Sequence, residues 1–439
     1  MFASRINNIA IYVTLLCVTN LVAAGIPFPE NDPTIVQTVL TPFKDFPEIH
    51  DLSADYPEIS ELSADSPKPP ETIFFLGEQL FDVTEYGAVA DGNSDSSSAF
   101  LSAWDAACAH AENATLYIPE GEFLLGPVTF SGPCSNGKSP NVEIRGALMA
   151  QPELDAFPDS NWIKFKQLNG IRVTGEKEEA ILDAQGGVEA WKQPSCSKSE
   201  KCKKLVTSLR FSNVSNGNIS NIALLNGKGF HVVFQDCNNI NIYNVNITAP
   251  GDSPNTDGIH VSQSTEINIA SSIIGVGDDC VSIGPGSINI SVFRIYCGPG
   301  HGISVGSLGR NPNEKDVMGI SVRNCTINGT QNGVRVKTWP GSLASKAFNF
   351  TFQDIIMINV SNPIIIDQEY CPSHDCDTSK DSLVKLSNIE FKNISGTYNS
   401  KSKITLHCSS SVPCENIQFE DIHLTHTKKP EILGKFGSV

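Results

Sequence analysis

Short runs of alternating apolar and polar residues make up most of the chain from about residue 116 onward. In each run Val, Ile or Phe occupies every second position, and Asn, Gly, Ser or Asp bounds the run. A period of two is typical of β-strands with one buried face. One earlier segment differs, because Asp95 can cap a stretch to about Ala111 whose apolar residues lie on one side of a helix. The pattern therefore predicts an all-β fold that begins with one short helix.

The strand runs are near-copies of one motif, spaced 23, 27 and 21 residues apart and roughly thirty thereafter. A strand this short cannot bury its apolar edge alone, whereas stacked copies form a solenoid with a continuous core. We therefore expect a parallel β-helix with a short N-terminal capping helix. A β-sandwich is the alternative, but it does not require so uniform a spacing. The copies begin at Asn218, Asn241, Asn268, Asn289, Ile320, Phe350, Ile389 and Ile417.

The two ends of the chain have a different composition. Residues 1–24 carry Arg5, a short apolar run and a small-residue cleavage site, which predicts a secretory signal peptide. Residues 25–76 are rich in Pro, Ser and acidic residues, which predicts a disordered leader or propeptide. Residues 77–439 are expected to form the folded domain. The chain stops at Val439 without the further coil expected of a capped solenoid, so we expect an open C-terminal edge.

The net charge of −17 argues against nucleic acid as a partner, since phosphate binding needs a basic face. No apolar run is long enough to span a membrane, so we expect a secreted, extracellular protein, a monomer with no membrane partner. An acidic polymer is compatible with this charge only if a local cationic cleft offsets it.

Twelve cysteines follow Cys17, and an even count in an exported chain favours disulfides. Close spacing suggests the pairs Cys108–Cys134, Cys196–Cys202, Cys280–Cys297, Cys371–Cys376 and Cys408–Cys414. Cys237 and Cys325 remain, and we expect them to be buried thiols. A zinc site at Cys371, His374 and Cys376 lacks a second matching pair, so we expect no metal.

Ten Asn-x-Ser/Thr sequons occur, and some of them are expected to carry glycans. Asn at the same corner of successive coils can also stack its amides in an internal ladder, which is our main interpretation.

Four short motifs follow one another between residues 255 and 337: Asn255-Thr256-Asp257, Gly277-Asp278-Asp279-Cys280, Gly300-His301-Gly302 and Arg335-Val336-Lys337. Because they fall on successive coils, stacking should bring Asp257, Asp278, Asp279 and His301 onto one face. Neighbouring carboxylates push their protonation states apart, as acid and base roles require. Arg335 and Lys337, two apart on a strand, would present two cations to an acidic ligand.

These motifs resemble the four signature motifs of the polygalacturonase family of glycoside hydrolases. The resemblance extends over most of residues 77–439. It implies a right-handed parallel β-helix that hydrolyses α-1,4 bonds of galacturonan with inversion and without a cofactor or metal. It further implies that Asp278 is the general acid, while Asp257 and Asp279 hold and deprotonate water.

The remaining site residues follow from the same resemblance. His301 would either keep Asp278 protonated or contact the sugar, while Arg335, Lys337, Tyr370 and Asn255 would bind substrate. The sequence alone gives His231, His260 and His374 a structural or surface role. Alternative functions are a hydrolase of rhamnogalacturonan or xylogalacturonan, a calcium-dependent pectate lyase, and a non-catalytic wall-binding protein. The sequence does not decide between endo and exo attack.

Overall fold

The computed structural model describes residues 79–427, except residue 136 and the segments 177–179, 193–204 and 373–375. All described residues belong to one compact unit. The expected signal peptide and leader lie outside the described residues, as do Cys196, Cys202 and His374.

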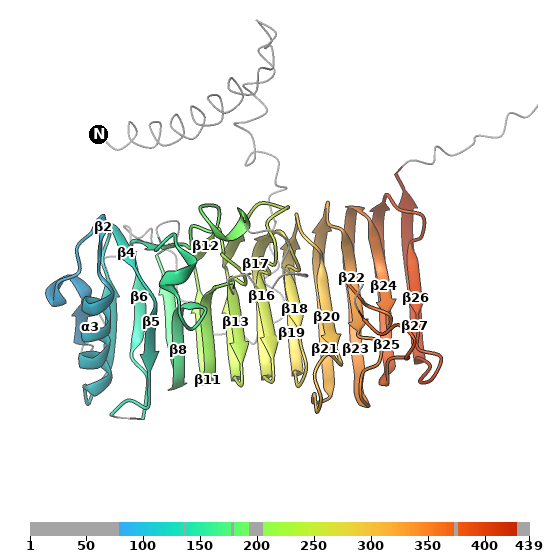
Figure 1. The fold of residues 1–439 in the computed structure, drawn as a ribbon, viewed down its shortest axis with the longest axis horizontal. Helices are drawn as coiled ribbons and strands as arrows, with labels where there is room; N and C mark the ends of the chain where they lie inside the picture. Colours follow the sequence, from blue (N-terminus) through green and yellow to red (C-terminus); the bar gives the residue numbers. More distant parts are fainter. Residues whose placement is uncertain (1–78, 136, 177–179, 193–204, 373–375, 428–439) are drawn as a thin grey trace, which may run out of the picture. The chain divides into compact units, whose positions relative to one another are not determined.

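The described residues form a right-handed parallel β-helix, in which every strand pairing is parallel. Its coils stack in sequence order along the long axis, from α3 at one end to β27 at the other (Figure 1). Corresponding strands of successive coils form three ladders, and long strands such as β11 bend from one ladder into the next. The prediction of a parallel β-helix is confirmed.

The first ladder contains β5 (Val128–Ser131), β8 (Asn161–Asn169), β11 (Thr207–Ser220), β13 (Val232–Gln235), β16 (Ile259–Ser262), β18 (Val281–Ile283), β20 (Ile303–Leu308), β22 (Asn332–Thr338), β24 (Asn362–Asp367) and β26 (Ile404–His407). The second contains β1 (Gln79–Asp82), β3 (Ala114–Ile118), β6 (Asn141–Ile144), β9 (Arg172–Gly175), part of β11, β14 (Asn238–Tyr243), β17 (Thr265–Gly275), β19 (Ile288–Cys297), β21 (Val317–Asn328), β23 (Ser345–Val360), β25 (Val384–Tyr398) and β27 (Glu415–His426). The third contains β2 (Asp91–Asp95), β4 (Glu122–Leu125), β7 (Ala147–Ala150), β10 (Ile181–Asp183), β12 (Ala223–Leu225), β15 (Asn246–Thr248) and the later parts of β17 to β27.

Identical or similar side chains stack inside the coils because the alternation places every second residue inward. The repeated motif lies in the second ladder, where Ile242 pairs with Ile269 and Ile269 with Val292. In the first ladder the rings of Phe165, Phe211 and Phe234 stack with centroids 5.1 and 5.2 Å apart. One continuous apolar core results, and it makes the outward face of each strand rigid enough to carry a site.

Helix α3 (Ser97–Ala109) is the single α-helix among the described residues, and short 3₁₀ turns lie at η1 (Val83–Tyr86), η2 (Leu154–Ala156) and η3 (Ala190–Lys192). It lies at the N-terminal end of the solenoid (Figure 1) and buries Phe100 and Trp104. The capping position is Ser96 rather than the expected Asp95, although Asp95 accepts a hydrogen bond from the Ser97 amide at 3.0 Å, and the helix ends at Ala109, two residues before the expected Ala111. No helix in the described part of the chain is long and apolar enough to cross a membrane.

The asparagine ladder exists, but it is not internal. Asn268 donates to Asn241 at 3.0 Å, and Asn241 donates to Asn218 at 3.3 Å. Asn268 is exposed and the other two are half-buried. The predicted location is wrong because the inward positions of these strands are taken by Ile, and burying amides there would cost desolvation energy.

Four of the five expected disulfides are present, at Cys108–Cys134, Cys280–Cys297, Cys371–Cys376 and Cys408–Cys414. The fifth, Cys196–Cys202, lies outside the described residues. Cys237 and Cys325 are buried free thiols, as expected.

Candidate active site

The acidic motifs occupy the turns that lead into successive strands of the first ladder. Asp257 precedes β16, Asp278 and Asp279 precede β18, and His301 precedes β20. Main-chain hydrogen bonds join these turns, since the Gly258 amide donates to Asp279 at 2.9 Å and the His301 amide donates to Asp278 at 2.7 Å. Residues about twenty apart in sequence therefore become direct neighbours.

Glycine at position 302 is required by this close stacking of the turns. Its φ is +85°, in the left-handed region that favours glycine. A Cβ atom there would lie 2.1 Å from the carbonyl oxygen of Asn332 in the next coil. Gly302 therefore allows the turn that carries His301 to approach the following coil.

Asp279 is the most buried of the three carboxylates, with 1% of its surface exposed. Arg335 donates to its Oδ1 at 3.0 Å, and Lys337 donates to its Oδ2 at 2.8 Å. Both cations come from β22, two coils farther along. Their pairing with Asp279 was not anticipated from the sequence, which predicted only that they would bind a substrate carboxylate. Two cations therefore surround this one buried carboxylate.

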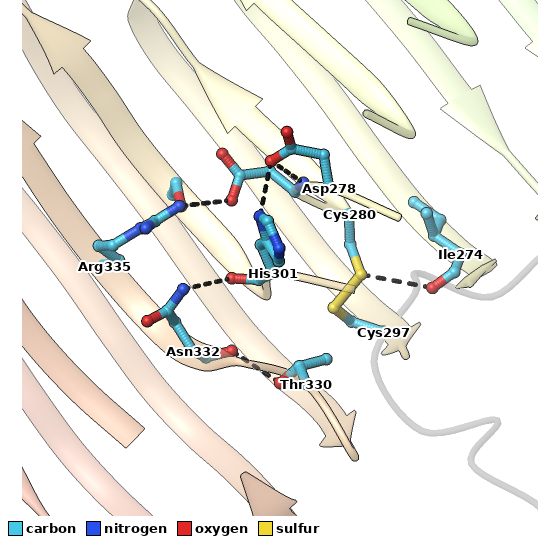
Figure 2. The surroundings of a disulfide bond; sticks show 10 residues. Ile274, Asp278, Cys280, Cys297, His301, Thr330, Asn332 and Arg335 are labelled. Carbon is cyan, nitrogen blue, oxygen red and sulfur yellow. Dashed lines mark hydrogen bonds and ion pairs between the residues drawn. A yellow bond between two sulfur atoms is a disulfide. The ribbon is translucent and has the colours of Figure 1, made fainter. Parts of the chain in front are cut away.

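Asp278 is the most accessible of the three carboxylates, since 20% of its side chain is exposed. His301 Nδ1 lies 2.9 Å from Asp278 Oδ1, and Figure 2 shows the imidazole pointing at this carboxylate. Asn255 donates to Asp278 Oδ2 at 3.3 Å. An accessible carboxyl held by two neighbours is suited to reach an atom of a bound ligand.

The environment of Asp278 favours its ionised form. Burial acts to raise its pKa, but the hydrogen bond from His301, the positive charge of that ring and the charge of Lys337 outweigh burial and hold the pKa below its ordinary value. Of the two roles that the sequence offered for His301, this contact with Asp278 favours a role in orienting the carboxylate.

Asp257 has the opposite environment. Burial raises its pKa well above the ordinary value, and the charges of Asp278 and Asp279 raise it further. Its Oδ2 accepts a hydrogen bond of 2.7 Å from Ser282, which acts in the other direction. Three neighbouring acids imply that one of them has a raised pKa, and in this structure that carboxyl is Asp257.

Asp257→Asn is expected to stabilise the fold at neutral pH. In the wild type the free energy of unfolding falls as the pH rises from the ordinary pKa of an aspartate to the raised pKa of Asp257, because the folded state resists ionisation. The amide does not ionise, so at pH 7 the variant should gain about 1–2 kcal/mol. Urea unfolding at pH 4 and pH 7 measures this, and a variant less stable than wild type at pH 7 would contradict it.

Tyr370 lies beside the cations of the site. Its ring centroid is 5.1 Å from Lys337 Nζ and 5.7 Å from the guanidinium carbon of Arg335. Trp339 meets the same ring edge-on at 5.7 Å. The structure thus brings together all eight residues named from the sequence, with Tyr370 forming an aromatic wall next to the positive charge.

Comparison with known proteins shows the family of the chain. The family model described as glycosyl hydrolases family 28 matches residues 108–435. The chain belongs to glycosyl hydrolase family 28. It is 44% identical over 347 residues to an exopolygalacturonase of Platanus acerifolia, covering 79% of this chain and 90% of that protein. It is also 44% identical over 372 residues to a polygalacturonase of Gossypium barbadense, covering 82% and 90%.

Solved structures agree on the fold of this glycoside hydrolase. An exopolygalacturonase from Thermotoga maritima matches with a TM-score of 0.65 and 17% identity, covering 82% of this chain and 88% of that one. An endo-xylogalacturonan hydrolase from Aspergillus tubingensis matches with a TM-score of 0.64 and 22% identity, covering 79% and 93%. At these identities the likeness concerns the β-helix alone.

The family 28 site contains one group of side chains with the spacing of metal ligands. Ligand atoms of Asp278, Asp279 and His301 lie within 4.8 Å of one another. However, both oxygens of Asp279 already accept hydrogen bonds from cationic side chains. A divalent cation at this place would be repelled by Arg335 and Lys337, so the donor set does not fit calcium.

Four contributors to the site were missed in the sequence. Ser282 donates to Asp257, and Ser304 donates to Asp279 at 2.8 Å. His260 contacts Ser282, and His231 contacts the main chain of Asp257, although both histidines were expected to be structural or at the surface. The missed signal was positional, because Ser282 and Ser304 occupy the outward place of their strands directly after an acidic or histidine motif.

Proposed function

We propose that this glycoside hydrolase cleaves the α-1,4 bonds of galacturonan, the acidic chain of de-esterified pectin. The observation that carries this proposal is an accessible carboxyl, Asp278, beside two buried carboxylates and two buried cations. The carboxylates supply acid and base, and the two cations offer binding partners to the carboxylate of an acidic sugar. The names of the relatives, polygalacturonase and exopolygalacturonase, support the same substrate.

The proposed reaction inverts the configuration at the anomeric carbon in one displacement. Asp278 gives its proton to the leaving glycosidic oxygen, while Asp257 and Asp279 hold a water molecule and one of them takes its proton. The hydroxyl adds to the anomeric carbon as the glycosidic bond breaks. In each turnover Asp278 therefore loses one proton to the leaving group, and Asp257 or Asp279 gains one proton from the water molecule.

The role of general acid requires a protonated Asp278, whereas His301 and Lys337 act to lower the pKa of this carboxyl. A bound galacturonate adds negative charge near Asp278 and displaces water from it. Both changes raise the pKa of a carboxyl, so the polymer itself converts Asp278 into an acid. Arg335, Lys337 and Tyr370 are proposed to hold the uronate carboxylate while Asn255 and His301 orient Asp278.

We extend the proposal to the mode and place of action. Five similar relatives with 40–45% identity are named exopolygalacturonases, including two from Zea mays, which favours attack at chain ends. A secreted monomer acting in the cell wall fits the signal peptide expected from the sequence.

The release of reducing ends from polygalacturonate by the purified protein tests the proposed function. We expect activity that persists with excess chelator, and monomer as the sole early product. A ladder of oligomers would replace exo by endo attack. Loss of activity on chelation, or activity only on rhamnogalacturonan or xylogalacturonan, would contradict the proposed chemistry.

A further inference from the structure

Asp257 is connected to His260 through a single hydroxyl group. His260 Nδ1 lies 2.8 Å from Ser282 Oγ, and Ser282 Oγ donates to Asp257 Oδ2 at 2.7 Å. His260 and Ser282 are register partners on β16 and β18, so their side chains leave the first ladder one above the other. The carboxyl, the hydroxyl and the imidazole therefore form one short chain of hydrogen bonds.

The hydrogens available on each group determine which group donates each of these hydrogen bonds. A serine hydroxyl has one hydrogen, and Ser282 gives it to Asp257. His260 Nδ1 must then donate to the oxygen of Ser282, so its hydrogen lies on Nδ1. Burial lowers the pKa of His260 to about 4, with the charge of Arg210 acting in the same direction. A neutral ring with a fixed tautomer thus keeps the hydroxyl pointed at the carboxylate.

A second histidine holds the main chain of Asp257. His231 Nδ1 lies 3.0 Å from the carbonyl oxygen of Asp257, and its Nε2 accepts from the Gly227 amide at 3.0 Å. His231 is fully buried. The backbone and the side chain of Asp257 are therefore held independently, and Ser282 is the one hydrogen-bond donor to the carboxyl group among the residues that the structure describes.

We propose that His260 is a positioning residue for the reaction: it acts through Ser282 to fix the orientation of the Asp257 carboxyl and to favour its ionised form. The proposal rests on the proposed function, in which Asp257 helps to hold and deprotonate the attacking water. A hydrogen bond donated to a carboxylate favours ionisation, which opposes the strong effect of burial at this position. His260 thus keeps a buried carboxyl usable as a base.

The hydrogen-bonded series Asp257–Ser282–His260, which we call the relay, has charged groups near both of its ends. Asp257 faces the carboxylates of Asp278 and Asp279 and the ammonium of Lys337. His260 faces Arg210 in addition to Asp279 and Lys337, and its ring packs against Phe230 with centroids 5.1 Å apart. None of these groups changes when the relay alone is cut, so a change in pH dependence reports the relay.

The test compares four variants by the pH dependence of kcat/KM for reducing-end release. Ser282→Ala removes the hydroxyl, and His260→Phe keeps a ring against Phe230 but removes the donor. His260→Asn restores a donor near the place of Nδ1. Ser264→Ala is the matched control, because this buried hydroxyl bonds the main chain of Ser262 and Cys237 at the other end of these strands.

Without the hydrogen bond from Ser282, the pKa of Asp257 rises. As the pH is lowered, the base is then protonated earlier, so the acid limb of the activity profile lies at a higher pH. We expect this acid limb to move up by about one pH unit in Ser282→Ala and His260→Phe, with kcat about tenfold lower and KM little changed. His260→Asn and Ser264→Ala should keep the wild-type limb. Loss of stability without a moved limb is what a merely structural role would give.

An unmoved limb in Ser282→Ala overturns the relay, as does a limb in His260→Asn that moves as far as in His260→Phe. Should His260→Phe fail to fold, Ser282→Ala carries the test alone. A wild-type protein without activity overturns the proposed function and the relay with it. An active wild type with unmoved variants overturns the relay alone.

Discussion

Asp278→Asn lowers kcat on polygalacturonate by about a hundredfold to ten-thousandfold, the range expected when a general acid is removed. The amide has nearly the shape of the carboxyl and can keep the contacts with His301 and Asn255, but it has no proton to give to the leaving oxygen. KM should change little because the groups proposed to bind the uronate remain. Reducing-end assays at saturating substrate measure the effect.

Asp236→Asn provides the matched control for this variant. The same substitution of aspartate by asparagine is made here at an exposed corner between β13 and β14. The φ of Asp236 is +55°, which asparagine tolerates. Its activity should equal that of wild type. Equal rates for Asp278→Asn and Asp236→Asn would remove the assignment of Asp278 as the acid.

Asp279→Asn destabilises the fold by about 3–5 kcal/mol, the largest stability effect we expect in the site. Asp279 accepts hydrogen bonds from Arg335, Lys337 and Ser304, and both cations are less than a tenth exposed. A neutral amide leaves two buried positive charges without a counterion and turns an NH₂ group toward one of them. Urea unfolding with the disulfides intact measures the loss as a lower midpoint.

A double-mutant comparison separates charge from shape in this prediction. Lys337→Met removes one cation while keeping a long side chain, so Asp279→Asn should cost less in its presence than in the wild type. Additive costs would show that the pairing of Asp279 with Lys337 does not contribute to stability. The contrast with Asp257→Asn is informative, because there the removal of a buried charge is expected to stabilise the protein.

The architecture was predictable because each coil repeats the same alternating sequence motif. Alternation of apolar and polar residues fixed which side chains face inward, and the regular spacing implied that the strands stack in register. The pairing of Ile242 with Ile269 and of Ile269 with Val292 follows directly from this pattern. The asparagine ladder was misplaced because an amide repeat gives the period but not the face.

The membership of the site was also predictable, but its internal pairing was not. Each acidic or basic motif contains or precedes an outward polar residue between two apolar ones, in the order His260, Ser282, Ser304 and Arg335. These four residues are register partners across β16, β18, β20 and β22. This positional signal was present in the sequence, and it acquires meaning only once the strands are aligned.

By itself, the sequence determined the β-helix and its capping helix through periodic patterns. Close spacing only suggested the disulfides, and four short motifs together with a family resemblance named the eight residues that meet in the site. Only the tertiary structure decided that Arg335 and Lys337 bind Asp279, that Asp257 is the carboxyl with the raised pKa, and that His260 reaches it through Ser282. The physical reason is that charge pairing and burial depend on distances of about 3 Å between different coils. Spacing along the chain specifies which coils are neighbours, but it does not specify which side-chain atoms meet.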